Sequence, residues 1–229
     1  MNDSNIRIGF LTIGQSPRID VMDDIRPLLV GIEIIEAGAL DDFDKDYITS
    51  NLSPESGETP LVTRLRDGSQ VIISEEKILP LLQDKIYLLE KRNVKAIVIL
   101  CSGRFPEFKS KTPIIYPDRI LEAFVMPILN KDDVLGIIAP LPEQHNYIMN
   151  KWSRVTSNIA IEYVSPYTGS IDDYISCCKR LIEKNTKLIV LDCIGYSFSI
   201  KELVRSETNL PVISTRSALA SYLRELYVL

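Results

Sequence analysis

Two cysteines in equivalent sequence contexts are the residues best suited to chemistry in this chain. Cys101 ends the apolar run VKAIVILCSG and Cys193 ends TKLIVLDCIG, and the two stretches align 92 positions apart, with Gly103 matching Gly195. A single buried cysteine is usually just a small hydrophobic residue. Two cysteines at matching strand ends favour a functional pair instead, because the glycine two residues later lets the chain turn and leaves backbone N–H groups available.

Two opposed thiols can move a proton without a cofactor. One thiolate takes a proton from a carbon next to a carboxylate or carbonyl, and the thiol on the opposite face donates one. The intermediate carbanion needs N–H groups or cations to hold its charge. The thiolate needs a lowered pKa, which helix N-termini and nearby arginines provide. Nucleophilic attack by a single thiolate is the alternative chemistry.

A candidate anion site lies in the segment TIGQSPRID, residues 12–20. Ser16 is a typical helix N-cap residue, and Pro17 suits the first helical position. The free N–H groups of such a helix start are expected to bind a carboxylate or phosphate, and Arg18 can add a bidentate contact. The alternative is a plain capping motif with an arginine on the surface.

The substrate-binding residues that we expect flank these three strand ends. They are Thr12, Gly14, Gln15, Ser16, Arg18, Ser102, Gly103, Arg104, Gly195 and Tyr196. His145, in the matching loop of the second half, is a candidate acid–base group, although a lone histidine in a loop is more often incidental. Tyr116, Arg119 and Arg216 follow the fourth strand of each half and could line the rim of the cleft. They are weaker candidates, because arginines on a helix surface are usually solvated.

Apolar runs and amphipathic stretches alternate along the chain, which predicts parallel β-sheets covered by helices on both faces. Strands are expected at 6–13, 31–39, 96–100, 112–117, 134–141, 159–167, 187–191 and 210–215. Helices are expected at 17–29, 79–91 and 118–129, in a segment ending at Trp152, at 171–184 behind the cap Ser170, and at 217–227. Ligands of such sheets bind beyond the carboxyl ends of the strands, where all three candidate sites lie.

The two halves of the chain repeat each other beyond the cysteines. TPIIYPDRILEAFV and LPVISTRSALASYL align strand for strand and helix for helix, 98 positions apart. We therefore expect a duplicated α/β unit, with a first lobe over 1–117 and a second over 118–215. The first lobe has an insertion at about 53–74, where alternating runs flank Asp67-Gly68, a strong β-hairpin signal. We expect the hairpin to pack over the ligand cleft or on a second subunit; a solvent-exposed decoration is the alternative.

Composition excludes several classes of protein. The chain has 229 residues, of which 45% are hydrophobic and 25% charged, as in an ordinary globular protein. Its net charge of -5 argues against a surface for nucleic acid or anionic membranes. No apolar run reaches the roughly 18 residues of a membrane span. The N-terminus lacks the features of a signal peptide, so we expect a cytoplasmic protein.

Cysteine and histidine usage argues against disulfides and metal sites. The four cysteines show no CxxC spacing, and there is one histidine, so neither disulfides nor a zinc site is expected. Cys177 and Cys178 fall inside an expected helix and are expected to be core residues. Because neither a Walker loop nor a GxGxxG motif occurs, no nucleotide cofactor is expected.

The segments LTIGQSPRID, SPESGETPLVTRL and VLDCIG resemble the AroM family, and the resemblance extends over nearly the whole chain. More broadly, the duplicated units with paired strand-end cysteines are similar to the aspartate/glutamate racemase superfamily. That group includes cofactor-independent racemases, hydantoin racemases, maleate isomerases and arylmalonate decarboxylases. The resemblance implies two flavodoxin-like lobes with the active site between them, and Cys101 and Cys193 as its catalytic pair. It also implies that the C-terminal helix, 216–229, packs on the first lobe.

The chain departs from the amino-acid racemases of that superfamily beside both cysteines. Those enzymes follow the first cysteine with Asn-Thr or similar and the second with Thr-His, whereas this chain has Ser102-Gly103 and Ile194-Gly195. We therefore expect a cofactor-independent racemase, isomerase or decarboxylase that acts on another small carboxylate. The alternatives are a non-catalytic protein that binds a small carboxylate on the same fold, and a flavodoxin-type nucleotide-binding module. The sequence is also compatible with a homodimer.

Overall fold

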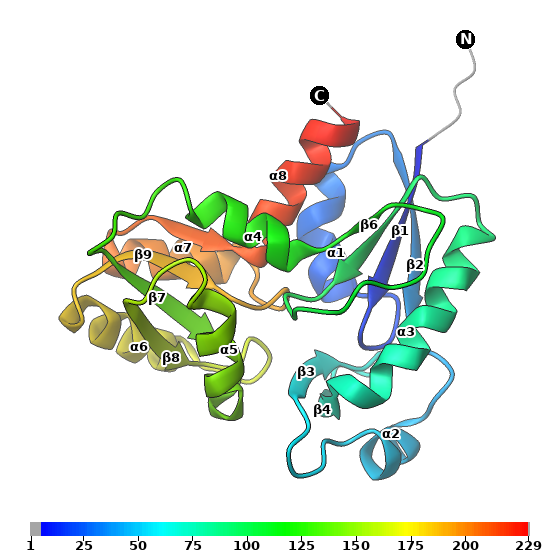
Figure 1. Ribbon diagram of the computed structural model, residues 1–229, viewed down its shortest axis with the longest axis horizontal. Helices are drawn as coiled ribbons and strands as arrows, with labels where there is room; N and C mark the ends of the chain where they lie inside the picture. The colour runs from blue at the N-terminus through cyan, green and yellow to red at the C-terminus, as the bar shows by residue number, and fades with distance from the viewer. Residues whose placement is uncertain (1–5, 229) are drawn as a thin grey trace. The chain divides into compact units, whose positions relative to one another are not determined.

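The computed structural model describes residues 6–228, which form two compact α/β units (Figure 1). The first unit contains the described residues up to Pro117 together with those from Ala220 onward, and the second unit is Asp118–Leu219. Each unit is built on its own four-stranded sheet.

The first unit has a parallel sheet with the strand order β2-β1-β5-β6. Its strands are β1 (Ile6–Thr12), β2 (Ile32–Gly38), β5 (Ala96–Leu100) and β6 (Ile114–Ile115). The central strand β5 is buried throughout, as expected of a parallel sheet that is covered on both faces. The register pairs Thr12 with Leu100, so the loops that follow β1 and β5 begin side by side.

Helices of the first unit follow its strands. They are α1 (Ile19–Ile25) with a short 3-10 helix η1 (Arg26–Leu28), α2 (Lys45–Asn51) and α3 (Glu75–Glu90). Helix α4 (Pro117–Val125) begins at Pro117 and from Asp118 onward belongs to the second unit. Helix α3 packs on β1 and β2. Its buried side chains recur at helical spacing, at Ile78, Leu82, Ile86 and Leu89.

The predicted hairpin is present as β3 (Pro60–Arg64) and β4 (Gln70–Ser74), which pair antiparallel. In its turn the Leu65 N–H donates to the Ser69 carbonyl at 2.8 Å and the Gly68 N–H to the Leu65 carbonyl at 3.0 Å. Gly68 has φ +86, a left-handed conformation that glycine adopts without steric cost. The hairpin shares the hydrophobic core that contains Leu11 and Ile99 through four side chains: Leu61, Leu65, Val71 and Ile73. It is therefore part of the first unit's core and not a solvent-exposed decoration.

The second unit repeats the same topology. Its strands are β7 (Val134–Ala139), β8 (Ile159–Tyr163), β9 (Thr186–Leu191) and β10 (Val212–Ser214), in the parallel order β10-β9-β7-β8. When β7 is matched to β1, β8 to β2, β9 to β5 and β10 to β6, the two strand orders are identical. The duplication predicted from the sequence is therefore confirmed.

Helices of the second unit also follow its strands. They are η2 (Pro142–Gln144) continuing into α5 (His145–Trp152), then α6 (Ile171–Glu183) and α7 (Phe198–Thr208). Helix α8 (Thr215–Tyr227) begins in this unit and from Ala220 onward belongs to the first unit. Helix α6 begins with a capping box: the Asp173 N–H donates to the Ser170 hydroxyl at 3.2 Å, and the Ser170 N–H donates to the Asp173 carboxylate at 2.8 Å. The predicted cap Ser170 is thus confirmed. Of the helix expected over 216–229, residue 229 lies outside the described residues.

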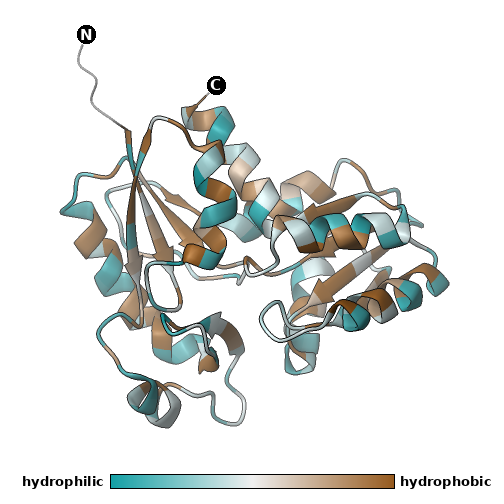
Figure 2. Ribbon diagram, turned by 180° about the vertical axis from the view of Figure 1, so that it is seen from behind, coloured by the Kyte–Doolittle hydropathy of each residue, from teal (hydrophilic) through white to brown (hydrophobic). Residues whose placement is uncertain are grey.

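Each unit has its own hydrophobic core. Figure 2 shows the strands of both sheets as largely hydrophobic, whereas the helices show both hydrophilic and hydrophobic residues. Within residues 6–228, no helix combines the length and the apolar character needed to cross a bilayer.

Two helices were not expected, and a third begins later than expected. Both α2 and α7 are absent from the sequence-based assignment, although each has a side-chain cap: Asp44 accepts from the Tyr47 N–H and Ser197 from the Ile200 N–H. Helix α1 begins at Ile19, not at Pro17.

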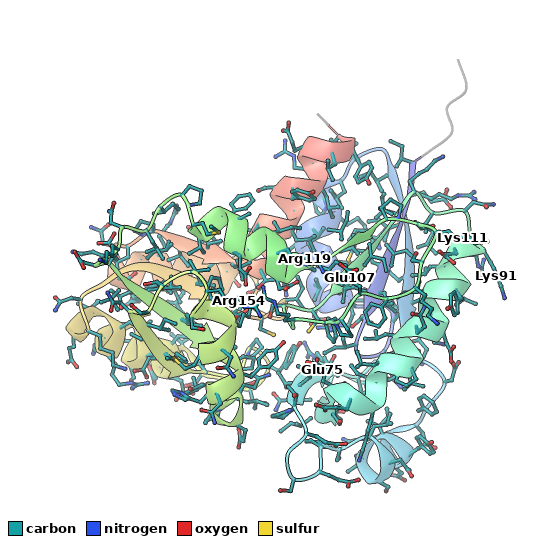
Figure 3. The ribbon with its side chains drawn as sticks, in the orientation of Figure 1. Glu75, Lys91, Glu107, Lys111, Arg119 and Arg154 are labelled. Atoms are coloured by element: carbon teal, nitrogen blue, oxygen red, sulfur yellow. The ribbon has the colours of Figure 1, made fainter. Side chains whose placement is uncertain are left out.

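Glu75, labelled at the first turn of α3 in Figure 3, is an acid group held in an unfavourable environment. Its carboxyl oxygen Oε2 is buried and accepts no hydrogen bond among the described residues. Burial, and then the charge of Glu76, raise the pKa of Glu75 from 4.5 to about 7. The folded state therefore binds this proton more tightly than the unfolded chain. The stability gained from this proton is fully present below the pKa that Glu75 has in the unfolded chain. It is lost as pH rises through the pKa that Glu75 has in the folded state.

We therefore expect Glu75→Gln to unfold at higher urea concentration than the native chain above pH 7, because the buried charge is removed. The two proteins should have similar stability near pH 4.5, the ordinary pKa of this group. Urea unfolding at both pH values measures the difference. The exposed Glu183→Gln serves as the control. A gain at Glu75 that does not depend on pH would contradict the argument.

Candidate functional site

The two cysteines lie in the same turn at equivalent strand ends. Cys101 follows β5 directly, and Cys193 follows β9 after one residue. In each unit the glycine two residues later donates its N–H to the sulfur, Gly103 to Cys101 Sγ at 3.3 Å and Gly195 to Cys193 Sγ at 3.4 Å. Both are buried thiols that form no disulfide. A hydrogen bond donated to sulfur favours the thiolate over the thiol, so this turn suits acid–base or nucleophilic chemistry.

Arg216 fixes the turn at Cys193 from the side opposite the sulfur. Its buried guanidinium donates to the Ile194 carbonyl from Nε at 3.1 Å and from Nη2 at 2.9 Å, and to the Gly195 carbonyl at 3.0 Å. In a planar trans peptide the carbonyl and the following N–H point in opposite directions. Holding the Ile194 carbonyl toward Arg216 therefore aims the Gly195 N–H at Cys193. The expectation that Arg216 is a solvated surface arginine is wrong, since it is 1% exposed.

Asp192 anchors the other side of the same turn. Its carboxylate accepts from Lys151 Nζ at 2.7 Å and from Trp152 Nε1 at 2.8 Å, and both Asp192 and Lys151 are buried. Two buried charges are tolerated when they pair and their remaining atoms are hydrogen-bonded. This contact ties the end of α5 to the residue before Cys193.

Tyr196, which we expected to bind substrate, lies in the core of the second unit. It is fully buried, and its hydroxyl donates to the Val164 carbonyl at 2.7 Å. Burial, together with the neighbouring Cys193, raises the pKa of Tyr196 well above its ordinary value. Gly195 is required beside it, because a Cβ there would lie 2.8 Å from Pro166 Cγ. The segment Gly195-Tyr196 therefore shapes the turn, and Tyr196 has no hydroxyl proton to spare for a ligand.

The turn at Cys101 packs against the aromatic ring of Phe105. A Cβ on Gly103 would lie 3.2 Å from the ring of Phe105, which is itself buried. Ser102 is buried and Arg104 half-buried in the same turn. The structure thus brings the four residues Cys101 to Arg104 together at one strand end, and Ser102 and Arg104 stay predictions as ligand contacts.

The loop after β1 differs from the expected helix start. Ser16 is not an N-cap: its N–H and hydroxyl both donate to Asp41, at 2.6 and 2.8 Å, and the Gly38 N–H donates to the same carboxylate at 2.7 Å. The backbone N–H of Arg18 donates to Glu36 at 2.8 Å. An ionised carboxylate is a stronger acceptor than a hydroxyl. The donors expected to hold a ligand's carboxylate therefore hold two carboxylates of the protein.

Side chains of this loop are also engaged within the first unit. Arg18 is buried and forms a two-fold contact with Asp20, at 2.9 and 2.8 Å, so the alternative of a surface arginine is wrong. Its Nη1 donates to Thr12 Oγ1 at 3.1 Å. Gln15 donates to the Phe43 carbonyl at 2.9 Å and accepts from the Arg66 N–H at 2.9 Å.

Gly14 in the same loop packs against the hairpin. A Cβ there would lie 2.7 Å from the Arg64 carbonyl oxygen. Together with the Gln15 contact, this closeness makes the loop after β1 a junction between the sheet and the hairpin. Sequence reasoning did not identify Arg64, Arg66 or Asp41 at this junction, because only the folded hairpin brings them to the loop.

The remaining titratable candidates lie in the second unit. His145 is exposed at the start of α5, and its Nδ1 lies 2.6 Å from the Tyr163 hydroxyl. Cys177 and Cys178 are core residues, and burial raises their pKa values to about 12 and about 11. Within residues 6–228, no three His, Cys, Asp or Glu side chains are grouped so as to hold a metal ion.

Comparison with known proteins places this geometry in context. The family model described as AroM protein matches residues 8–227. No curated protein matches the chain by sequence. A liganded mutant of arylmalonate decarboxylase aligns with a TM-score of 0.66 at 12% identity, covering 97% of this chain and 93% of that chain.

Two racemase structures align similarly. Glutamate racemase from Aquifex pyrophilus has a TM-score of 0.60 at 12% identity, covering 96% of this chain and 84% of that chain. Allantoin racemase from Klebsiella pneumoniae has a TM-score of 0.58 at 13% identity, covering 96% and 87%. At such identities the likeness shows the fold.

Removing the Arg216 guanidinium should disturb the turn at Cys193. We expect Arg216→Met to lower the free energy of unfolding by about 2 to 4 kcal/mol, because two buried carbonyls lose their donor. Urea unfolding measures this loss, and the alkylation rate of Cys193 relative to Cys101 reports the turn itself. Arg205→Met, at an exposed arginine paired with Glu202, should change stability by no more than about 0.5 kcal/mol. An unchanged Arg216→Met protein would show that the guanidinium does not support the turn.

Proposed function

The chain belongs to the AroM family, and from that membership and its racemase-like fold we propose that it is a cofactor-independent racemase, isomerase or decarboxylase. Its substrate is a small carboxylate. Solved structures with the same fold include a glutamate racemase, an allantoin racemase and an arylmalonate decarboxylase. The observation that carries the proposal is the repeated turn in which a glycine N–H donates to the sulfur of Cys101 or Cys193.

In the proposed mechanism the two thiols act on one substrate. The thiolate of one cysteine removes the proton from the carbon next to the carboxylate, and the C–H electron pair is delocalised onto the carboxylate. The thiol of the other cysteine then returns a proton to the opposite face, so the two cysteines exchange protonation states. In a decarboxylation, loss of CO₂ creates the same carbanion, and one thiol protonates it.

The carboxylate of the substrate needs hydrogen-bond donors near the first thiol. Ser102 and Arg104 follow Cys101 closely and are the proposed contacts, because the Gly103 N–H is already donated to the sulfur. Ser16 and Arg18 hold Asp41 and Asp20, so in this proposal they support the loop between β1 and α1. Donors that stabilise developing negative charge are usually the largest single contribution to such catalysis.

A non-catalytic carboxylate-binding protein is the second candidate function. It is favoured by the residues beside the two cysteines, Ser102 and Ile194, which differ from those of the amino-acid racemases. A protein of this kind would keep the ligand site without needing activated thiols. The two functions differ in the reactivity of the cysteines and in turnover.

The first test uses the cysteines themselves. We expect Cys101 and Cys193 to react with iodoacetamide as thiolates below the ordinary thiol pKa of about 8.5, because each sulfur accepts an N–H. Peptide mass spectrometry between about pH 5 and pH 9 follows each residue. Cys177 and Cys178, with pKa values of about 12 and about 11, are internal controls. Malonate should protect the reactive pair together; separate protection would refute a shared substrate.

The second test measures proton transfer directly. In D₂O the native chain should exchange deuterium into the carbon next to the carboxylate of its substrate, detected by NMR over a panel of small carboxylic acids. Cys101→Ser and Cys193→Ser should each lower this rate by about 10²- to 10⁴-fold, because a hydroxyl is a much weaker acid and base. Cys178→Ala is the control. Full exchange by either serine variant would rule out the paired mechanism, and ligand binding without exchange would favour the second function.

A further inference from the structure

A cavity in the first unit lies between the start of α1 and the turn of the hairpin. It has a volume of about 370 Å³ and is lined by the segments Pro17–Asp20 and Arg64–Gly68. This volume falls within the range of small-molecule sites, roughly 300 to 1,000 Å³. Neither cysteine lines it. Three arginines do: Arg18, Arg64 and Arg66.

Arg64 places a guanidinium in the wall of the cavity. Its side chain is half-buried, and Nε donates to the Gly68 carbonyl at 2.8 Å. Among residues 6–228, Arg64 has no ion-pair partner, and no acceptor bonds its two terminal nitrogens. A charge partly removed from water is costly without a partner. A planar guanidinium with two open donors matches the geometry of a carboxylate or phosphate.

The other charges around the cavity are already accounted for. Arg18 is paired with Asp20 at 2.8 Å, so these two charges offset each other. Arg66 donates to the Ser16 carbonyl at 2.8 Å and lies 3.3 Å from Asp41. Asp67 accepts two hydrogen bonds from Ser69, at 2.8 and 2.6 Å, within the turn. Asp67 keeps its negative charge, so the lining is close to neutral overall, and what Arg64 offers a ligand is a pair of terminal donors that no described group of the protein occupies.

The hairpin turn sets the position of Arg64. Gly68 adopts φ +86, and a Cβ there would lie 3.3 Å from Arg64 Nη2. The guanidinium thus lies across the glycine, with its Nε fixed by the Gly68 carbonyl. A donor fixed in this way loses less conformational entropy when a ligand binds.

We propose that this cavity is a binding site for a small oxyanion, held by Arg64 with Arg66 at the rim. The shared chemistry is a planar or tetrahedral group with two or more charged oxygens, from either a carboxylate or a phosphate. The site uses neither Cys101 nor Cys193, so it goes beyond the proposed function and exists whether or not the chain is catalytic.

Titration calorimetry of the full chain with malonate and with inorganic phosphate tests the site. At least one anion should bind, and Arg64→Gln should weaken it by tenfold or more, because the bidentate donor is lost. Arg66→Gln should weaken it less, since Arg66 remains occupied by Ser16 and Asp41. The anion that binds more tightly identifies the source of the oxyanion.

Three controls separate binding from folding and from chemistry. Arg92→Gln removes the same charge from an exposed position in the same unit and should bind as the native chain does. Arg64→Lys keeps the charge and tests the bidentate geometry, because Lys offers a single point of contact. Inorganic phosphate should bind the Cys101→Ser, Cys193→Ser double variant as it binds the native chain, and loss of phosphate binding there would place the anion at the cysteines and overturn the proposal.

Backbone amide NMR shifts locate the bound anion. Residues 64–68 and Arg18 should shift with added anion in the native chain and not in Arg64→Gln. Absence of binding by both anions, or equal affinity in native and Arg64→Gln proteins of equal thermal stability, would overturn the proposal.

Discussion

A peptide N–H that is buried at the end of a parallel strand needs an acceptor, and this requirement organises both units. After β1 the acceptors are the carboxylates of Asp41 and Glu36. After β5 and β9 the acceptors are the sulfurs of Cys101 and Cys193. A carboxylate is charged and satisfies its donors fully, whereas a thiol is a weak acceptor that gains most from the donor when it ionises. The same backbone requirement is thus met by charged carboxylates in one loop and by thiols in the other two.

The two cysteine turns are alike in geometry but supported differently. At Cys193 the buried Arg216 holds two carbonyls, and Asp192 is bound by Lys151 and Trp152. At Cys101 the packing partner of the turn is the ring of Phe105. Duplication preserved the N–H to sulfur contact while the supporting residues diverged.

Sequence patterns predicted the fold well because they report burial. The apolar runs, the repeat and the Asp67-Gly68 turn are all local signals, and the sheets and hairpin follow from them. Helices α2 and α7 lack a long apolar stripe and depend on caps and neighbours, so periodicity missed them. Ser16 and Tyr196 were assigned from local rules, but distant partners decided their roles: Asp41 and Val164 lie 25 and 32 positions away. The burial of Arg216 was missed for the same reason, because no residue near it in the sequence indicates that it will be buried.

The hairpin connects the cavity lined by Arg18, Arg64 and Arg66 to the turn at Cys101 in the first unit. The Arg66 N–H donates to Gln15, and Gln15 donates to the Phe43 carbonyl, so the hairpin, the loop after β1 and the loop after β2 share one network. Thr12, at the start of that loop, pairs in register with Leu100, the residue before Cys101. An anion at Arg64 would stiffen the hairpin turn and therefore the loop that borders this cysteine. The insertion thus reaches the neighbourhood of Cys101 through hydrogen bonds and strand register, and it contributes no cysteine of its own.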